Sequence, residues 1–381
     1  MNRREFIQLS SLLPTLGLSS NIFAKANQAK APILLLVELK GANDALNTLV
    51  PIDDDNYRKL RPKLALKTTD TIALNEGFAM HKALQPLMKH WSAGEMAWLH
   101  GLGYSNPNRS HFRSIEIWES GSDSDDYDTE GWLSKLYTTR TDHLTGVVIG
   151  SDAGPMAGET LDTLVMEDAK SYEALAKRLK AVRAETSNNA LSRILDVQNN
   201  VQQNAKSVIQ TLNGGQSSKT TFPKNKFGKQ LEQAAHLVRN DLGASIYKVE
   251  LGGFDTHRGQ LKTQDRLLKQ LAQGLSAFAE EMKQHGQWDN VVVMTYSEFG
   301  RRAAENKSGG TDHGTAAAHF VMGGRVRGGF HGKAPRLDQL DNNGDLIYTS
   351  DFRSLYNTVA TQWLKRPSPW SSFAPFSLIH T

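Results

Sequence analysis

Short apolar runs alternate with longer helical segments along this sequence, and that alternation restricts the fold more than any other feature. The run "APILLLVEL" (31–39) is almost continuously apolar and is bounded by Pro32 and Gly41. Such a run is typical of a strand that is buried on both faces, as in a parallel sheet. With short connections between strands and helices, the pattern predicts an α/β fold, a mostly parallel sheet with helices on both faces.

The same kind of evidence places the other elements. Strands are predicted at 96–103, 145–150, 244–251, 290–300 and 318–324, and helices at 81–94, 105–121, 229–240, 260–286 and 350–364. Two of these helices show an apolar face at helical spacing. We expect one face to contain Phe112, Ile115 and Trp118, and the other to contain Leu261, Leu268, Leu271, Leu275 and Phe278.

The chain of 381 residues is long enough for one large α/β domain. We predict a single domain over 31–365, with a helical insertion at about 168–240 and a C-terminal tail at 366–381. The absence of cysteine excludes disulfides, cysteine nucleophiles and iron–sulfur ligation. A net charge of only +4, with no basic block, makes a nucleic-acid partner unexpected.

The N-terminal segment resembles an export signal. It contains the pair Arg3-Arg4, a weakly apolar stretch, and Ala24-Lys25-Ala26 as a cleavage site. This pattern predicts a twin-arginine signal over residues 1–26, with the twin-arginine translocase as a transient partner. No other segment is apolar for long enough to span a bilayer stably, so we expect a periplasmic or secreted protein.

Polar side chains follow the predicted strands, where ligands bind in folds of this class. Asp44 follows the first strand, and Ser110 and His111 follow the second at the start of a helix. The later positions are Asp255 and His257, then Glu298 and Arg301, then Asp312 and His313. Carboxylates and imidazoles without cysteine suit Zn²⁺, Mn²⁺, Mg²⁺ or Ca²⁺.

Each of these residues also has an ordinary structural explanation. Ser110 is well placed to cap a helix, Asp44 to shape a turn, and Glu298 to pair with Arg301 or Arg302. Asp312 and His313 lie in a glycine-rich loop, where one could bind a metal while the other supports it. The shared location of all these groups at strand ends favours a metal site.

Several motifs together resemble a family of exported bacterial proteins, domain of unknown function 1501. They include "ELKGANDALNTLVP", "NRSHFRSIEIWESG", "GGFDTHRGQ", "YSEFGRR", "GTDHGTAAAHFVMGG" and "TSDFRSLY", in that order. The resemblance runs from about residue 31 to residue 365. It implies an alkaline phosphatase-like core, since the family is similar in fold to the alkaline phosphatase and sulfatase superfamily.

Superfamily members use a two-metal site and a nucleophile at a helix start. The resemblance implies that Asp44, Asp255, His257 and His313 bind metal, with Asp312 beside them, and that Ser110 is the nucleophile. Glu298 stands where the superfamily has an Asp-His pair, and His111 could supply a missing ligand.

These patterns support two functional hypotheses. The first is an exported metal-dependent hydrolase that acts on a small-molecule or cell-surface phosphate or sulfate ester. In it, Ser110 attacks and Arg301 or Arg113 binds the ester oxygens. The second is a non-catalytic metal-binding protein that binds or assembles cell-surface material. A purely structural role is less favoured, because buried polar clusters carry a desolvation cost.

Overall fold

The computed structural model describes residues 31–176, 204–215 and 218–380. Within these residues nine strands form one sheet, in the order β11-β5-β10-β9-β1-β8-β6-β7, with β12 paired to β5. Their bounds are β1 Ile33–Lys40, β5 Met96–Gly103, β6 Gly146–Ile149, β7 Thr163–Met166, β8 Ile246–Gly252, β9 Val291–Tyr296, β10 Ala317–Met322, β11 Gly329–His331 and β12 Ser350–Asp351.

The sheet is mostly parallel, as the sequence predicts. Strand β1 lies at its centre and pairs in parallel with β8 on one side and β9 on the other. Strand β10 is the exception, since it runs antiparallel to both of its neighbours, β9 and β5. Strand β5 therefore points the same way as β9, β1 and β8.

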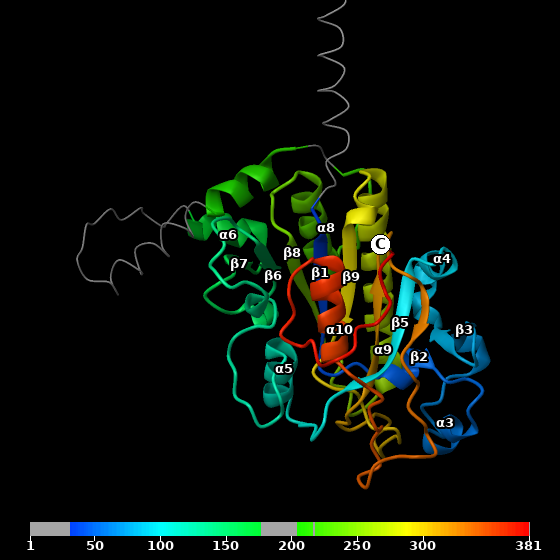
Figure 1. The fold of residues 1–381 in the computed structure, drawn as a ribbon. Helices are drawn as coiled ribbons and strands as arrows, with labels where there is room; N and C mark the ends of the chain where they lie inside the picture. Colours follow the sequence, from blue (N-terminus) through cyan, green and yellow to red (C-terminus); the bar gives the residue numbers. More distant parts are fainter. Residues whose placement is uncertain (1–30, 177–203, 216–217, 381) are drawn as a thin grey trace, which may run out of the picture. The chain divides into compact units, whose positions relative to one another are not determined.

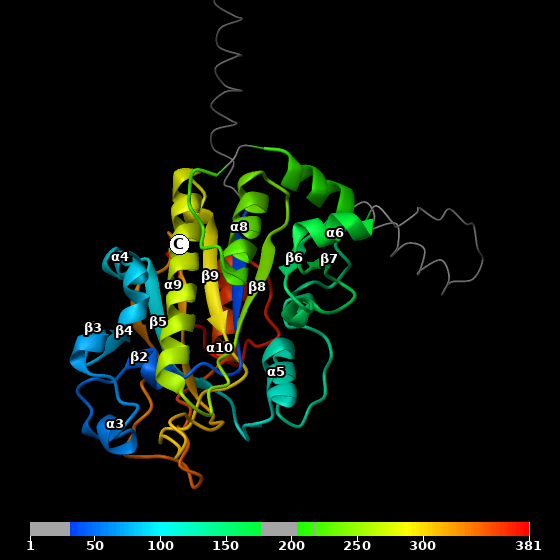
Figure 2. The same ribbon diagram turned by 180° about the vertical axis from the view of Figure 1, so that it is seen from behind.

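Helices cover both faces of this sheet (Figures 1 and 2). Alternate residues of β1 enter two separate cores, because successive side chains of a strand point to opposite faces. Leu35 and Val37 pack in the core that contains α8 (Lys226–Arg239) and α9 (Gln260–Gln284). Leu34 and Leu36 pack in the core that contains α5 (His111–Ser120) and α10 (Arg353–Thr358). The predicted α/β class with helices on both faces is confirmed.

The predicted elements recur with small shifts in their ends. Strand β5 has the predicted bounds, and α5 ends at Gly121, which adopts a left-handed conformation (φ 69°). The predicted helix 81–94 is instead a 3-10 helix, Lys82–Leu87, followed by α4, Met88–Ser92, because Pro86 lies inside the first turns. The predicted helix 350–364 divides into α10 and a π-helical segment, Val359–Trp363.

Two predicted apolar faces each include one residue that the structure places in solvent. Phe112 in α5 is 85% exposed, and Leu261 in α9 is 39% exposed. Both lie in the first turn of their helices, whereas Trp118 and Leu268, further along, are buried. Three short strands form a second sheet that the sequence did not indicate, namely β2 Leu49–Val50, β3 Thr71–Ala73 and β4 Ala79–His81.

Two short helices complete the described parts of the chain. They are α3 (Asp55–Leu60) and α6 (Ala169–Ala176), and residues 204–213 are also helical. The predicted export signal and the central part of the predicted insertion lie outside the described residues. A search of the described helices finds none that is both long and apolar enough to span a bilayer.

The strand directions bring distant segments to one edge of the sheet. The segments after β5, β8 and β9 leave the sheet at this edge, because these strands are parallel to one another. The segment before β10 reaches the same edge because β10 runs the opposite way. His111, Asp255, Glu298 and His313 come from these four segments.

Candidate metal centre

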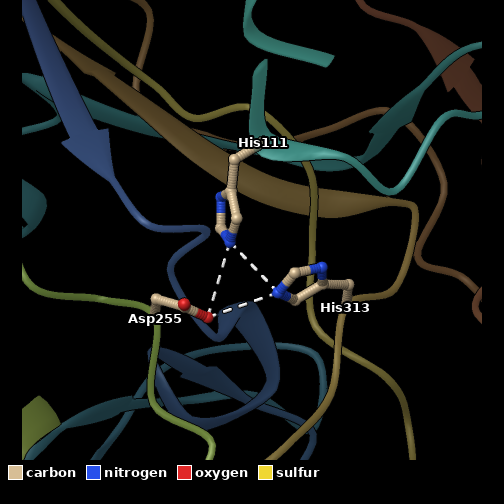
Figure 3. A group of neighbouring side chains, drawn as sticks. All are labelled: His111, Asp255 and His313. Carbon is tan, nitrogen blue, oxygen red and sulfur yellow. Dashed lines mark hydrogen bonds and ion pairs between the residues drawn. The ribbon is translucent and has the colours of Figure 1, made fainter. Parts of the chain in front are cut away.

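Three side chains from three separate segments converge at this edge (Figure 3). The Nε2 atoms of His111 and His313 are 3.0 Å apart. The Oδ1 atom of Asp255 is 3.5 Å from the first and 3.3 Å from the second. For bonds of 2.0–2.1 Å, neighbouring ligand atoms around a tetrahedral zinc ion lie roughly 3.3 Å apart. The three atoms thus have the spacing of donors to one ion.

His257 lies beside this group, whose three members His111, Asp255 and His313 have ligand atoms that all lie within 4.8 Å of one another. Its Nε2 lies 3.0 Å from His313 Nε2 and 3.0 Å from Asp255 Oδ1. It therefore lies against the same Asp255–His313 pair that His111 contacts. The local sequence explains the position, because residues 255 and 257 are two apart in extended chain and can face the same way.

Each of the three imidazoles is held through its other nitrogen by an oxygen atom. His111 Nδ1 is 2.7 Å from Glu298 Oε1, and His257 Nδ1 is 3.1 Å from Asp312 Oδ1. His313 Nδ1 is 2.8 Å from the backbone carbonyl of Arg109. A carboxylate or carbonyl oxygen only accepts hydrogen bonds, so each Nδ1 must carry the proton. Each neutral imidazole then presents an unprotonated Nε2 to the cluster.

The cluster therefore brings three nitrogen lone pairs and a carboxylate oxygen together. A proton on one Nε2 could form a hydrogen bond between His313 and either His111 or His257. In the remaining contact, two unprotonated nitrogen atoms would still face each other and repel. A divalent cation bound by His111, Asp255 and His313 satisfies these three donors, and His257 contacts two of them. Metal-binding histidines characteristically donate their second N–H to a carboxylate or a backbone carbonyl, and all three residues here do so. The donor set fits a cation.

Glycines allow the segments to approach one another this closely. A Cβ atom on Gly310 would lie 2.3 Å from the backbone carbon of His257, and one on Gly41 would lie 2.5 Å from the backbone nitrogen of Asp255. Gly41 also has a φ of +104°, which side chains disfavour. The loops after β1 and before β10 can thus close against the segment that carries Asp255 and His257.

Arg301 contacts the same oxygen of Asp255 that faces the histidines, and it contributes to the electrostatics of the cluster. Its Nη2 is 2.7 Å from Asp255 Oδ1, and its side chain is fully buried. Burial by itself would raise the pKa of Asp255, but the hydrogen bond and charge of Arg301 outweigh it and lower that pKa. The hydrogen bond that His111 donates to Glu298 raises the pKa of His111, whereas burial lowers that of His313.

The cluster is open to solvent. Asp255 and His257 have side-chain exposures of 45% and 43%, and His313 is 26% exposed. Structural zinc sites are enclosed by their four ligands, whereas catalytic sites keep one position accessible. The exposure favours a site that a substrate can reach.

Glu298 and Asp312 were predicted as metal ligands, but the structure places each behind a histidine. Oε1 of Glu298 binds His111 and also accepts a hydrogen bond from the backbone N–H of Gly41, at 2.9 Å. Asp312 binds His257 and accepts a hydrogen bond from Asn306 Nδ2, at 3.1 Å. Both carboxylates therefore orient histidines that are candidate ligands.

The structure also places Asp44 outside the cluster. Its two carboxylate oxygens accept hydrogen bonds from Arg61, at 2.6 and 3.0 Å, and both side chains are buried. Arg61 also donates to the carbonyls of Arg302 and Ala303, each at 2.8 Å. Asp44 is thus the buried counter-ion of an arginine that fixes the loop after β9.

Ser110 lies immediately before His111, as the N-cap of α5. It is exposed, and its side chain forms no capping hydrogen bond. Arg113, an alternative anion-binding residue, instead binds the carbonyls of Ser124 and Asp126 and lies over the ring of Tyr127. Among the predicted catalytic residues, only Ser110 therefore remains exposed beside the cluster.

Two residues of the site were not indicated by the sequence. Arg109 acts through its carbonyl oxygen, which no side-chain pattern reveals. Phe299 packs its ring 4.9 Å from the ring centres of both His111 and His313. The only signal for Phe299 was its place directly after Glu298.

A second acidic group lies further along the sheet. Glu38, Glu119 and Asp152 offer carboxylate oxygens that all lie within 4.8 Å of one another. Here, however, Lys248 Nζ occupies the centre, at 3.0, 3.4 and 2.7 Å from these three residues. A buried ammonium group already supplies the positive charge at this position.

Comparisons with known proteins give structural similarities at low sequence identity. The C-terminal periplasmic domain of EcEptC from Escherichia coli, in complex with Zn, has 8% identity and a TM-score of 0.39, covering 92% of this chain and 84% of that one. A protein in the alkaline phosphatase superfamily from Vibrio parahaemolyticus has 11% identity and a TM-score of 0.39, covering 90% and 68%. PsFucS1 sulfatase from Pseudoalteromonas sp. has 11% identity and a TM-score of 0.35, covering 81% and 65%, so this chain spans just under two thirds of the sulfatase's length.

No curated protein matches the sequence significantly. A family description does match, over residues 159–352, which is half of the chain and includes Asp255, His257 and His313. The chain belongs to the family described as Protein of unknown function (DUF1501).

Proposed function

We propose that this protein is a metal-dependent hydrolase that acts on phosphate or sulfate esters. The convergence of His111, Asp255 and His313, with His257 against two of them and each imidazole held by an oxygen at Nδ1, carries the proposal. Nitrogen and oxygen donors in this combination suit zinc first and manganese second. When bound, such an ion would polarise an ester oxygen as a Lewis acid.

The chain itself supplies groups that suit an anionic substrate beside the cation. Helix α5 begins at His111, and the side chain of its N-cap residue, Ser110, does not cap its first N–H groups. The N-terminus of a helix favours negative charge, so these N–H groups suit ester oxygens. The Ser110 hydroxyl is exposed at the same helix end and is our candidate nucleophile.

Arg301 has a different role in this proposal from the one that the sequence suggested. Its Nε and Nη1 atoms are buried, and no hydrogen-bond partner is present for them. Its Nη2 is committed to Asp255 and to the carbonyl of Phe254. We assign Arg301 to the positioning of Asp255, because a buried guanidinium cannot meet an ester in the open part of the site.

The proposal is tested by elemental analysis and by activity measurements on the same preparations. We expect about one divalent ion per chain in the wild type, since one open group of donors is present. His313→Ala should remove the ion, whereas His143→Ala, an exposed histidine elsewhere, should retain it. A wild-type protein that binds no divalent ion would refute the proposal.

Activity then separates the two functional hypotheses. The metal-loaded wild type should hydrolyse members of a panel of phosphate and sulfate esters, and Ser110→Ala should retain the ion but lose turnover. A metal-loaded protein that is inert across the panel would favour a non-catalytic metal-binding role.

We also propose export by the twin-arginine pathway, which the Arg3-Arg4 pair supports. The site requires contacts across most of the chain, and this pathway transports folded proteins. The double variant Arg3→Lys, Arg4→Lys should accumulate in the cytoplasm, as fractionation would show. Export that is unaffected by this change would argue for another route.

A further inference from the structure

A cavity of about 690 Å³ lies between the main sheet and the small sheet of β2, β3 and β4. The main sheet contributes His100 from β5 and Ala317 and Ala318 from β10, whereas β2, α3 and the segment 334–338 supply the other walls. The small sheet and α3 lie beside β5 in both views of the fold (Figures 1 and 2). The lining includes none of the proposed metal ligands, so the cavity is separate from the metal cluster.

The interior of the cavity is largely apolar and partly aromatic. Leucine and alanine side chains cover most of it, and Phe78, which is only partly buried, contributes a ring. The rings of Phe78 and His100 are 4.7 Å apart, and His100 also packs 5.1 Å from Phe330. The volume lies within the roughly 300–1,000 Å³ that is usual for sites of organic ligands. Because aromatic rings pack favourably against one another, this interior suits a ligand with an aromatic ring.

His100 is a polar group in this interior whose hydrogen-bonding capacity is unused. It is only 4% exposed, yet its ring nitrogens form no hydrogen bond with any residue that the structure describes. Burial lowers the pKa of His100 to about 4, so the imidazole is neutral at pH 7 and keeps one nitrogen as an acceptor. A buried polar group without a partner is unfavourable. Since His100 lines the cavity, a ligand with an N–H group on its ring can supply the missing partner.

The exposed part of the lining is acidic. Five carboxylates and two basic groups line the cavity, namely Asp53, Asp54, Asp55, Glu76 and Asp338 against Lys59 and Arg336. Arg336 already pairs with Asp338, at 2.9 and 2.5 Å. Four carboxylates and one lysine therefore remain, and this balance favours a cationic ligand over an anionic one.

Two of these carboxylates lie beside the aromatic wall. Glu76 precedes Phe78 by two residues, in the turn between β3 and β4. A Cβ atom on Gly77 would lie 3.1 Å from Oδ2 of Asp53, so Asp53 lies against the same turn. In the described parts of the chain, neither carboxylate has a hydrogen bond or an ion pair through its side chain. Both charges are thus available to an ammonium group whose apolar part enters the cavity.

We propose that this cavity binds an arylalkylamine, in which an aromatic ring with an N–H group is joined by a short chain to an ammonium group. The ring packs against Phe78, its N–H donates to His100, and the ammonium group pairs with Asp53 and Glu76. The cavity is large enough for two fused rings, such as an indole. The inference is independent of the proposed function, because neither a metal ion nor an ester takes part in this binding.

A pair of ligands with the same ring and opposite charge tests the proposal. Tryptamine and indole-3-propionate both carry a two-carbon chain on an indole, and each is titrated calorimetrically into the purified protein. We expect tryptamine to bind about tenfold or more tightly, because the carboxylates attract one ligand and repel the other. Salt at about 0.5 M should reduce this difference, since the carboxylates are exposed. Equal affinities, or no binding of tryptamine, would overturn the inference.

Variants of the two carboxylates locate the ammonium group. The double variant Asp53→Asn, Glu76→Gln alters exposed positions only and should remove most of the preference for tryptamine. Asp125→Asn is the matched control, because Asp125 is an exposed carboxylate that does not line the cavity. A preference that the double variant keeps in full would place the cation elsewhere and refute the assignment.

His100→Phe tests the contact with the ring. The phenyl ring fills a similar space between Phe78 and Phe330, so thermal unfolding should show a folded protein. The wild type should bind tryptamine several-fold more tightly than 1-methyltryptamine, which lacks the indole N–H, whereas His100→Phe should bind both equally. If His100→Phe still favours tryptamine, His100 does not accept the hydrogen bond and the proposed pose is wrong.

Removal of metal separates this proposal from the hydrolase proposal. Tryptamine should bind equally well before and after treatment with a chelator, because no proposed metal ligand lines the cavity. Loss of tryptamine binding with the metal would refute a separate amine site. A protein that binds tryptamine but hydrolyses no ester would leave the amine site intact and remove only the hydrolase proposal.

Discussion

Two groups of acidic and basic side chains on the same sheet have nearly the same spacing but opposite character. Around Lys248, three carboxylates surround an ammonium group that the chain supplies. At the edge of the sheet, Arg301 donates to Oδ1 of Asp255, but in the described residues no lysine or arginine side chain pairs with the three histidine Nε2 atoms. The first group is complete within the polypeptide, whereas the second calls for a cation from outside.

The two groups of side chains also differ in how deeply they are buried. Lys248 and Glu38 have side-chain exposures of 1% and 2%. Asp255 and His257 are more than 40% exposed. A buried charge needs a permanent partner, whereas an accessible set of donors can exchange its cation and admit a substrate. The spacing of the donor atoms alone therefore does not identify a metal site. A cationic side chain at the centre of a cluster distinguishes a cluster that needs no ion from one that can bind an ion.

The largest expected effect comes from removing the internal cation. Lys248→Met leaves Glu38 and Asp152 without their main partner, so we expect a loss of about 3–5 kcal/mol in the free energy of unfolding. Urea denaturation measures this loss, and metal content at the other site should not change. A loss below about 1 kcal/mol would mean that the lysine is not the essential charge of its cluster.

The second-largest effect is expected in the pH dependence of stability, through Glu119 in the cluster around Lys248. Burial raises the pKa of Glu119 to about 7, the charge of Lys248 opposing the shift. An acid whose folded pKa is raised stabilises the fold fully below its unfolded value near 4.5, and this contribution is lost as the pH rises through 7. Glu119→Gln should therefore be more stable than the wild type above pH 7, by on the order of 2 kcal/mol, and equal to it below pH 4.5.

The comparison with the wild type is essential in that experiment. Burial lowers the pKa of both His100 and His319 to about 4. Their stabilising contribution is present above the unfolded value of 6.5 and is lost as the pH falls toward 4, which is the opposite trend. Only the difference between variant and wild type isolates Glu119, and a difference that does not vary with pH would contradict the prediction.

Glu298→Gln tests the candidate metal centre directly, in comparison with the cluster around Lys248. The amide keeps the shape of the side chain but not the charge that holds His111, so zinc affinity should fall about 10- to 100-fold. Competition with a chromogenic chelator measures the change. Glu38→Gln, in the lysine-filled cluster, is the matched control and should leave zinc affinity unchanged.

The smallest effect is expected for Asp312→Asn. Asp312 supports His257 in the same way, but its side chain is 51% exposed, so solvent screens the interaction. We expect a loss of zinc affinity near the lower limit, about tenfold or less. A loss larger than that of Glu298→Gln would show that His257, and not His111, is the dominant donor.

The sequence was sufficient for the central elements and for the group of candidate ligands. Apolar runs identified β1 and β5, and the alternating apolar pattern of "ASIYKVEL" identified β8. Strand ends then indicated Asp255, His257 and His313 as candidates. The sequence could not predict that β10 runs antiparallel to its neighbours, since an apolar run does not indicate the direction of a strand.

The roles of individual residues within the site required coordinates. Asp44 follows a strand just as Asp255 does, but Arg61 lies 17 positions further along the chain and takes both of its oxygens. Glu298 and Asp312 have the chemistry of ligands, and only their contacts with Nδ1 atoms show that they orient histidines. Pairing of this kind depends on distances across the fold, which spacing along the chain does not encode.

The reversed direction of β10 has a consequence for the order of folding. Residues 297–316 leave the sheet after β9 and return to the same edge at β10, with a bridge between Arg301 and His313. That excursion can form as soon as β9 and β10 pair. Contact between His111 and His313, by contrast, closes a separation of 202 residues, and such long-range closure is slow. Binding of the proposed ion should thus come late, so that an occupied site would mark a chain whose assembly is finished.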